Sequence, residues 1–175
     1  MRVLLLFLAF LLVFGAVAQA EQLPQAVLEQ ARTPLKPVGT GTFRKFGFTI
    51  YRVTLWSADG TWNKNKPYAL QLRYARDLSK ETLVENVADD LGSQHVADDK
   101  TVQNWRGVLE QVLTDVKEDD TIVSLCLPQQ TYSPLFHNDN VILRTPDKAF
   151  IQAFFNIWLG ETADKDLRQK LLGQS

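Results

Sequence analysis

The sequence of 175 residues predicts an α+β fold, in which a large and mostly antiparallel sheet has helices packed on one face. One observation behind this prediction is the stretch of residues 38–56, where residues that favour an extended backbone are interrupted only by glycines. We expect two adjacent strands there, at the centre of the sheet. A second observation is the order of the patterns, which is strands, two helices, strands and two helices. Each helical pattern has one apolar stripe, and the sheet is the surface expected to bury these stripes.

The first segment is typical of an export signal. Arg2 precedes an unbroken apolar run, residues 3–14, and the small residues Ala18 and Ala20 form a signal-peptidase site. The apolar run is shorter than the roughly 20 residues that a membrane-spanning helix needs. We therefore expect cleavage after Ala20, no membrane span in the remaining chain, and delivery to a bacterial periplasm. The expected organisation is a signal peptide at residues 1–20, an N-terminal arm or short helix at residues 21–37, and one domain at residues 38–175.

The overall charge is close to neutral, and this bears on the partners of the protein. The formal net charge is −1, and no run of like charges forms a tail. This balance argues against nucleic acid as a partner and against strong attraction to anionic lipid. Cys126 is the single cysteine, so the chain forms no disulfide within itself. Because Cys126 lies in an apolar stretch with no histidine near it in sequence, we interpret it as a buried, inert strand residue.

The strands are predicted from alternation and from turn residues. Residues 48–56 have apolar side chains on both faces, so this strand is expected to be covered, at least in part, on both sides. Residues 57–67 are rich in turn formers and predict a hairpin connection that exposes Trp62. Residues 68–75 alternate cleanly, which predicts a strand with one solvent-exposed face. Further strands are expected at residues 121–127 and, as one or two short strands, at residues 129–144.

The helices are predicted from apolar spacing and from caps. They are expected at residues 24–31, 79–92, 99–116, 145–160 and 164–172. Ser79 and Thr145 are the predicted N-caps, because their hydroxyl groups can accept hydrogen bonds from free backbone amides of the first turn. The helix that follows Thr145 is the most strongly apolar one after residue 20.

The sequence contains no recognisable reaction machinery. His95 and His137 lie in polar loops without the partners that a metal site or a catalytic triad requires, and we interpret them as surface residues. The paired aspartates lack the spacing of a calcium-binding loop. Gly39 and Gly41 lead into strand residues rather than a helix, so they predict a kinked strand or a close backbone approach instead of a dinucleotide site. We predict no metal and no cofactor.

Polar side chains set within apolar strands are the most informative candidates for a binding site. They are Arg44, Thr49, Tyr51, Arg52, Arg73 and Tyr74. An arginine on a sheet face beneath covering helices suits the carboxylate of an otherwise apolar ligand. A bidentate, charge-assisted pair would fix the head group while the cleft buries the tail. In the alternative interpretation these arginines lie on the solvent-exposed face of the sheet or pair with a nearby acid.

Four segments occur in an order that is fairly specific for one family. They are VGTGTFRKFGFTIYRVTLW (residues 38–56), YALQLRYARDLSKETLVE (68–85), AFFNIWLGE (153–161) and LRQKLLG (167–173). Together they resemble the exported bacterial branch of the chalcone isomerase-like family. The resemblance implies an open-faced β-sandwich with a cleft between the sheet and its helices. Plant members cyclise chalcones with an arginine that steadies the phenolate and with tyrosine, lysine and threonine or asparagine groups that polarise the carbonyl through water. Other members bind fatty acids.

The resemblance also implies where the arginine of the family falls in this chain. It aligns best with Phe43, one position before Arg44, and a one-residue slip along a strand turns a side chain to the opposite face. A bulge near Gly41 or Gly47 would return Arg44 to the cleft face. Arg44 is therefore retained as a candidate for the cation that holds a ligand.

The remaining matches to the family are incomplete. Thr49 matches the threonine of the next strand, and Asn86 matches the asparagine of the first covering helix. The tyrosine of the family aligns with Thr82 or Leu83, where no tyrosine lies. With the tyrosine missing and the arginine displaced, chalcone cyclisation itself is not expected.

Three functions are compatible with these observations. In the first, the protein is a periplasmic, non-catalytic binder of a small amphipathic ligand such as a fatty acid. In the second, it is an isomerase, an intramolecular lyase that acts on an unsaturated carbonyl compound. In the third, it is an envelope interaction protein without a ligand, for which exposed Trp62 is the one indication. The candidate ligand-binding residues are Arg44, Thr49, Tyr51, Arg73 and Asn86.

Overall fold

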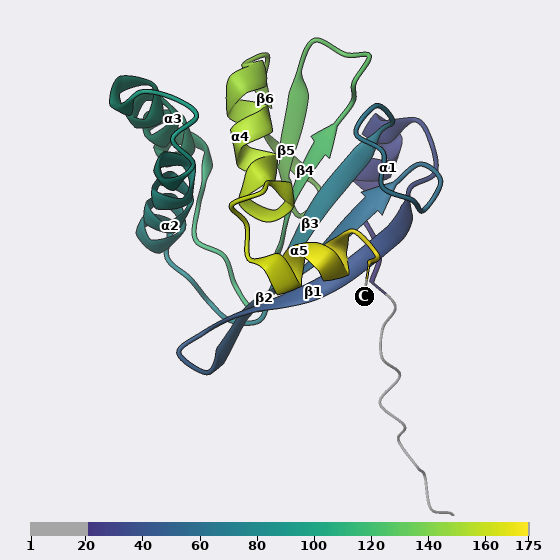
Figure 1. Ribbon diagram of the computed structural model, residues 1–175, viewed down its shortest axis with the longest axis horizontal. Helices are drawn as coiled ribbons and strands as arrows, with labels where there is room; N and C mark the ends of the chain where they lie inside the picture. The colour runs from purple at the N-terminus through teal and green to yellow at the C-terminus, as the bar shows by residue number, and fades with distance from the viewer. Residues whose placement is uncertain (1–20, 175) are drawn as a thin grey trace, which may run out of the picture.

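The computed structural model describes residues 21–174, and the predicted signal peptide lies outside them. Figure 1 shows the elements, which in chain order are α1 (Gln25–Ala31), β1 (Lys36–Lys45), β2 (Phe48–Ser57), β3 (Tyr68–Tyr74), α2 (Lys80–Ser93), α3 (Asp99–Val112), β4 (Thr121–Cys126), β5 (Ser133–His137), β6 (Asn140–Thr145), α4 (Lys148–Leu159) and α5 (Lys165–Leu171). Within this part of the chain, no helix has the length and apolarity that crossing a membrane requires.

The six strands form one antiparallel sheet, in which each strand pairs with the next along the chain. This confirms the predicted α+β class with a large antiparallel sheet. The prediction that residues 38–56 lie at the centre of the sheet is wrong for their first half, because β1 is an edge strand. The strands lie in the sheet in their sequence order, although α2 and α3 connect β3 to β4, so the first strand has a partner on one side alone.

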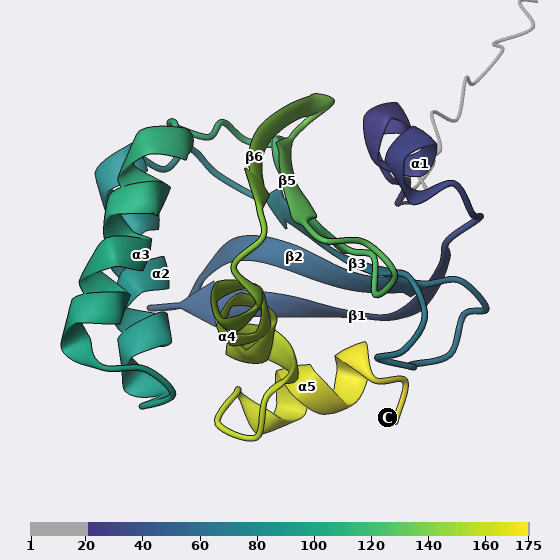
Figure 2. The same cartoon turned by 90° about the horizontal axis from the view of Figure 1, so that it is seen from above.

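Helices α4 and α5 cover one face of the sheet, and α1 covers part of the other (Figure 2). The larger core lies on the face of α2 to α5 and includes Leu55, Leu70 and Phe155. A smaller core lies on the opposite face, where Val27 of α1 clusters with Trp56. The prediction of helices on one face therefore holds for α2 to α5, and α1 is the exception.

Helices α2 and α3 form a hairpin that stands at one end of the sheet (Figure 1). They pack on each other, and α2 also packs on α4. Their buried apolar side chains, among them Leu91 and Leu109, belong to the same core cluster as Leu72 and Ile122 of the sheet. The apolar stripes are therefore buried in the core that they share with the sheet, and the two helices also cover each other. This arrangement leaves a cleft between α2 and the sheet.

Helix α3 ends earlier than the apolar spacing predicts. It ends at Val112, because Leu113 already has an extended backbone with φ −76° and ψ 147°. Val116 then pairs with Leu78 in an isolated antiparallel β-bridge. Val116 is therefore buried as part of this bridge and not on the face of a helix.

One of the two predicted N-caps is confirmed. The hydroxyl oxygen of Ser79 accepts a hydrogen bond from the Thr82 amide at 3.3 Å, at the start of α2. The prediction for α4 is wrong by two residues, because Asp147 and not Thr145 is its N-cap. The carboxylate of Asp147 accepts a hydrogen bond from the Phe150 amide at 3.0 Å. Asp147 also accepts one from the Trp105 indole, which ties α3 to the start of α4.

The glycines of β1 allow helix α5 to lie directly on the strand. A Cβ atom at Gly39 would be 2.0 Å from the Lys170 carbonyl oxygen, and one at Gly41 would be 2.2 Å from Leu167 Cδ1. Only a residue without a side chain fits at such distances. The structure confirms the close backbone approach predicted for these glycines, and the approach brings α5 to one side of the cleft.

The face of β3 opposite the larger core is buried at its centre, where the sequence predicts a solvent-exposed face. Gln71 is fully buried there. Its side chain accepts a hydrogen bond from Trp56 Nε1 at 3.0 Å and donates one to the Gln22 carbonyl at 2.9 Å. The segment before α1 thus covers this part of the sheet, and the alternation of β3 gives no sign of that cover.

Three residues singled out in the sequence have surroundings that differ from the prediction. Trp62 is half-buried against Tyr68, with ring centroids 5.0 Å apart, so it is not the exposed residue expected. His137 is half-buried too, with Nε2 at 3.1 Å from the Asp120 carboxylate. Cys126 is a free thiol that is less buried than expected. Within residues 21–174, no group of His, Cys, Asp and Glu side chains is arranged to hold a metal ion.

Candidate functional site: a cleft between the sheet and helix α2

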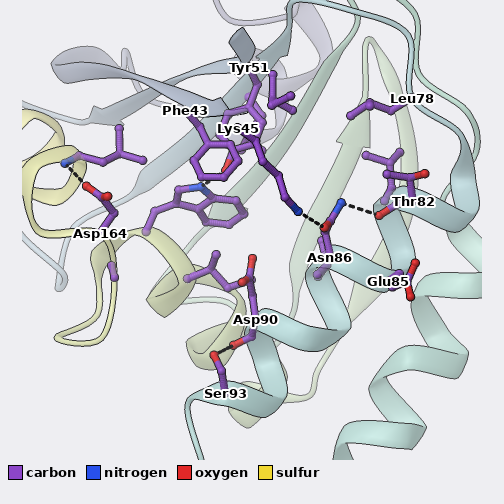
Figure 3. A pocket seen from close by; sticks show the side chains of 18 of the residues that line it. Phe43, Lys45, Tyr51, Leu78, Thr82, Glu85, Asn86, Asp90, Ser93 and Asp164 are labelled. Atoms are coloured by element: carbon purple, nitrogen blue, oxygen red, sulfur yellow. Dashed lines mark hydrogen bonds between the residues drawn. The ribbon is translucent and has the colours of Figure 1, made fainter. Parts of the chain in front are cut away.

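A cleft of about 650 Å³ lies between the sheet, α2 and the C-terminal helices. Strands β1 to β3 form one wall, α2 forms the opposite wall, and α4, α5 and the loop between them form the third. Figure 3 shows Phe43, Lys45 and Tyr51 of the sheet facing Asn86 and Asp90 of α2. The volume is in the range of roughly 300–1,000 Å³ that is common for small-molecule sites in proteins.

Aromatic rings form much of the wall on the sheet side. The rings of Phe43 and Tyr51 stack with centroids 5.0 Å apart. Tyr51 also contacts Tyr74 and Trp158 edge to face, with centroids 6.0 Å and 6.5 Å apart. Such aromatic contacts add about 0.5–1.5 kcal/mol each beyond the burial of area, so this wall is expected to be rigid. Apolar side chains of α2 and α4, among them Val87, complete the lining.

A β-bulge determines which side chains of the first hairpin reach the cleft. Phe43 pairs with Tyr51, but the next pair is Arg44 with Thr49, so Ile50 has no partner on β1. A bulge places two consecutive residues on nearly the same side of a strand. As a result both Ile50 and Tyr51 line the cleft, and on β1 Phe43 does so as well.

The hydroxyl group of Tyr51 is held in the cleft wall in its protonated form. Its oxygen accepts a hydrogen bond from Trp158 Nε1 at 3.0 Å. Burial is the main cause that raises the pKa of Tyr51 well above its ordinary value, and the Asp90 carboxylate raises it further. A phenol in this state still has a proton to donate. Tyr51 can therefore donate a hydrogen bond to a carboxylate or carbonyl oxygen in the cleft.

A second phenol, that of Tyr74, lies beside the first. Burial raises its pKa as well, and the neighbouring Tyr51 adds to the effect. The Tyr74 hydroxyl has no hydrogen-bond partner among the described side chains and backbone groups, although Tyr74 itself lines the cleft. The cleft thus offers two neutral donors on its aromatic wall.

The cationic group of the cleft is Lys45. Its Nζ donates a hydrogen bond to Asn86 Oδ1 at 3.4 Å, and Asn86 Nδ2 in turn donates to the Thr82 carbonyl at 2.8 Å (Figure 3). Lys45 is exposed, so its ammonium group lies at the rim of the cleft rather than in its depth. This arrangement puts a positive charge at the mouth and apolar surface below it.

Carboxylates at the rim limit where an anionic group can be bound. Glu85, Asp90 and Asp164 line the cleft, and Asp164 is already engaged as the cap of α5. Burial raises the pKa of Asp90, with a contribution from Asp89, whereas Lys45 lowers it. An anionic head group is therefore favoured only beside Lys45, and a neutral polar group is compatible with more of the rim.

The structure brings together only two of the five candidate site residues. Tyr51 and Asn86 line the cleft. Arg44 and Thr49 pair with each other across the hairpin and are not among the lining residues, which corrects the expectation that Arg44 holds a ligand. The bulge is in β2 at Ile50, so it does not turn Arg44 toward the cleft.

Arg73 also lies outside the cleft. Its neighbours on β3, Leu72 and Tyr74, face the cleft, and alternation therefore turns Arg73 to the opposite face. There its Nη1 donates to the Asp119 carbonyl at 3.2 Å, and its Nε lies 3.8 Å from the Glu21 carboxylate. The interpretation that this arginine pairs with a nearby acid is the correct one.

Sequence reasoning missed Lys45, Trp158 and Asp90 as residues of the site. Lys45 is two positions beyond Phe43, so strand alternation places both on one face, and this signal was present in the sequence. Asp90 is four positions beyond Asn86, which places both on one face of α2. No comparable signal links Trp158 to Tyr51, because their contact depends on how α4 packs on the sheet.

Known proteins resemble this chain in sequence or in fold. The chain matches a family model described as "Chalcone isomerase-like" over residues 16–173. An uncharacterized protein of Haemophilus influenzae is 26% identical over 142 residues, which cover 80% of this chain and 69% of that protein. The fold resembles the crystal structure of a fatty-acid binding protein of Arabidopsis thaliana, with a TM-score of 0.59 and 13% identity over 79% of this chain and 87% of that one. At that identity the likeness shows a shared fold.

Proposed function

We propose that this chain, which belongs to the chalcone isomerase-like family, binds a small amphipathic ligand such as a fatty acid in the cleft and does not convert it chemically. The single observation that carries the proposal is the polarity of the cleft. Apolar and aromatic side chains line its depth, whereas Lys45 and Asn86 lie at its rim. The Arabidopsis protein of the same fold is a fatty-acid binding protein, and this supports the choice of ligand class.

In this proposal the acyl chain lies against Tyr51, Val87 and Trp158, and the carboxylate lies beside Lys45. Each buried methylene group contributes about 0.8 kcal/mol, so most of the affinity comes from the tail. Lys45 and the phenol of Tyr51 then determine the orientation. The cation is thus Lys45, two positions beyond Phe43, with which the arginine of the family aligns.

The absence of an arginine from the lining supports a role without catalysis. Phe43 lies where the family's arginine aligns, and none of the described residues that line the cleft is an arginine or a histidine. A second candidate, an intramolecular lyase acting on an unsaturated carbonyl compound, is favoured by one observation. Tyr51, a protonated phenol, and Lys45 both reach the cleft. To separate the lyase from the non-catalytic binder, the protein is incubated with a chalcone and the absorbance of the chalcone is followed over time. Turnover that the Tyr51→Phe variant abolishes would favour the lyase.

The third function, an envelope protein without a ligand, loses its sequence argument. Trp62 packs on Tyr68, and the cleft beside α2 is open to a ligand. Export to a bacterial periplasm remains part of our proposal and is supported by the apolar run and the small residues that precede Glu21.

Titration with saturated fatty acids of increasing length tests the proposed function. We expect saturable binding to the delipidated protein, with an affinity that rises with chain length until the cleft is full. Isothermal calorimetry gives the dissociation constants, and the shift in Tm gives an independent measure. Absence of any heat or Tm shift across the whole series would contradict fatty-acid binding.

A further inference from the structure

The tip of the hairpin between β1 and β2 exposes two phenylalanine rings. Phe46 is 88% exposed and Phe48 is 62% exposed, which makes them the most exposed large apolar side chains of residues 21–174. Figure 1 shows this hairpin projecting beyond the rest of the sheet. Exposed aromatic rings that lie together on a projecting element are typical of an interaction surface.

The backbone at this tip is unfavourable for the residue it carries. Phe46 has φ 51° and Gly47 has φ 81°, so both residues of the two-residue turn have positive φ. Such turns favour asparagine or glycine at both positions, and a bulky residue with positive φ is strained. Neither the turn nor solubility in water accounts for a phenylalanine at position 46. Backbone strain of this kind is found preferentially at functional sites.

Cations surround the two rings. Lys45 Nζ lies 6.0 Å from the centroid of the Phe46 ring, and the guanidinium carbon of Arg76 lies 5.2 Å from that of Phe48. Arg44 is exposed beside them. Residues 36–57 contain four basic residues and no acidic one, although the whole chain has a formal charge of −1. The near-neutral net charge of the whole chain led us to expect only weak attraction to anionic lipid. This hairpin nevertheless carries a local excess of positive charge.

The acidic groups near these cations lie on other elements or are paired. Asp77 follows Arg76, but its carboxylate accepts a hydrogen bond from Lys117 Nζ at 3.0 Å and one from the Glu118 amide at 2.9 Å. Glu85 and Asp90, which interacts with Lys45, lie across the cleft on α2. The charged groups on the hairpin tip itself are thus positive.

We propose that this tip docks on the surface of an anionic lipid bilayer. The two rings would insert at the boundary between head groups and acyl chains, and Arg44, Lys45 and Arg76 would lie against lipid phosphates. A bilayer fits better than a protein partner, because the tip is a convex projection of two rings, whereas peptide segments bind in grooves or along exposed strand edges.

Docking would bring the mouth of the cleft to the lipid surface. Lys45 and Phe46 belong both to the tip and to the lining of the cleft. An amphipathic ligand would then pass between bilayer and cleft over a short distance. This consequence rests on the proposed function, but the docking itself does not.

Flotation with lipid vesicles tests the docking. The purified protein is mixed with vesicles of phosphatidylcholine, either alone or with added phosphatidylglycerol. We expect binding only to vesicles that contain phosphatidylglycerol, weakened by salt. Replacing both rings, as Phe46→Ser with Phe48→Ser, should weaken binding at least about tenfold. Arg44→Gln and Arg76→Gln should each weaken it about fivefold. Val96→Ser, which removes another exposed apolar side chain, is the matched control and should have no effect.

Three results would overturn the proposal. They are equal vesicle binding by the wild type and the double serine variant, binding that does not depend on phosphatidylglycerol, and a Phe46-dependent self-association or protein complex without vesicle binding. Phe48→Ser separates docking from ligand binding, because Phe48 does not line the cleft. It should weaken vesicle binding and leave the affinity for a soluble short-chain fatty acid unchanged. A wild-type protein that binds the vesicles but binds no fatty acid would overturn the proposed function alone.

Discussion

The ring of Phe43 stacks on the ring of Tyr51, with centroids 5.0 Å apart and planes inclined by 18°. The two residues face each other across the first hairpin, next to the bulge at Ile50. Phe43 aligns with the arginine that chalcone cyclisation uses in the family. Its ring makes this end of the cleft apolar and gives Tyr51 a hydrophobic neighbour. This apolar wall suits the hydrocarbon tail of the proposed ligand, and the one cation among the described lining residues, Lys45, is at the rim.

Lys45→Gln should weaken fatty-acid binding about fivefold, or about 1 kcal/mol, because the ammonium group is exposed and its attraction is screened by solvent. The matched control is Arg44→Gln, which removes the same charge one residue away on the other face of β1. Calorimetry with one fatty acid compares the two variants. If Arg44→Gln weakens binding as much as Lys45→Gln, the assignment of Lys45 as the head-group contact is wrong.

Tyr51→Phe should lower the free energy of unfolding by about 1–3 kcal/mol, because it leaves the buried Trp158 Nε1 without its acceptor. Tyr74→Phe is the control. It removes a hydroxyl that has no partner among the described residues, so stability should change by less than about 0.5 kcal/mol. Urea unfolding measures both variants. Equal effects would show that the hydrogen bond between Tyr51 and Trp158 does not stabilise the cleft wall.

Asp90→Asn should raise stability at neutral pH. Burial and Asp89 raise the pKa of Asp90 in the folded protein, and Lys45 opposes them. The folded state therefore holds the Asp90 proton more tightly than the unfolded state does. The protonated carboxyl group does not destabilise the fold, but the folded protein loses stability as the pH rises from the ordinary carboxyl pKa through the raised one. The gain of the asparagine variant should disappear in acid, below the ordinary pKa. Tm measured against pH tests this, and a gain that is the same at every pH would contradict it.

The same variant should bind fatty acids more tightly at neutral pH, because it removes a negative charge from the rim beside Lys45. A fatty alcohol of equal length serves as the ligand control, since its head group carries no charge. Its affinity should not change. A similar gain for acid and alcohol would indicate that Asp90 acts through shape and not through charge.

Gly39→Ala should destabilise the protein by about 1–3 kcal/mol or more, because the added methyl group would meet the Lys170 carbonyl at 2.0 Å and displace α5. The control is Gly107→Ala within α3, where a Cβ atom would meet nothing within 4 Å. That change should stabilise the protein by about 0.5–1 kcal/mol through helix propensity. Thermal unfolding compares the two variants, and a neutral Gly39→Ala would show that α5 is not held against β1.

The elements themselves were predictable because local patterns encode them. Alternation identified β3, the spacing of apolar residues identified α2 and α4, and Ser79 identified the start of α2. Local patterns do not encode which other segment of the chain packs on each face of a strand or helix. The buried state of Gln71 depends on the segment before α1, and the edge position of β1 depends on the order of pairing. The mutual packing of α2 and α3 is likewise a tertiary property.

The site was predicted less well than the fold. The alternation that puts Phe43 and Lys45 on one face of β1 was present in the sequence, but the family resemblance pointed to Arg44. The bulge that would have turned Arg44 toward the cleft is absent from that position, because the extra residue is Ile50 on β2. Tyr51 was found because it is a polar residue within an apolar strand, and it lines the cleft.

Native mass spectrometry, combined with lipid extraction, tests the proposed function most directly. The wild-type protein is compared with Val87→Trp, which fills the cleft from α2, and with Val96→Trp, which places the same ring on an exposed position. We predict a bound fatty acid in the wild type and in Val96→Trp, and an empty cleft in folded Val87→Trp. A wild-type protein that carries no lipid, and whose Tm no fatty acid shifts, would contradict the proposed function.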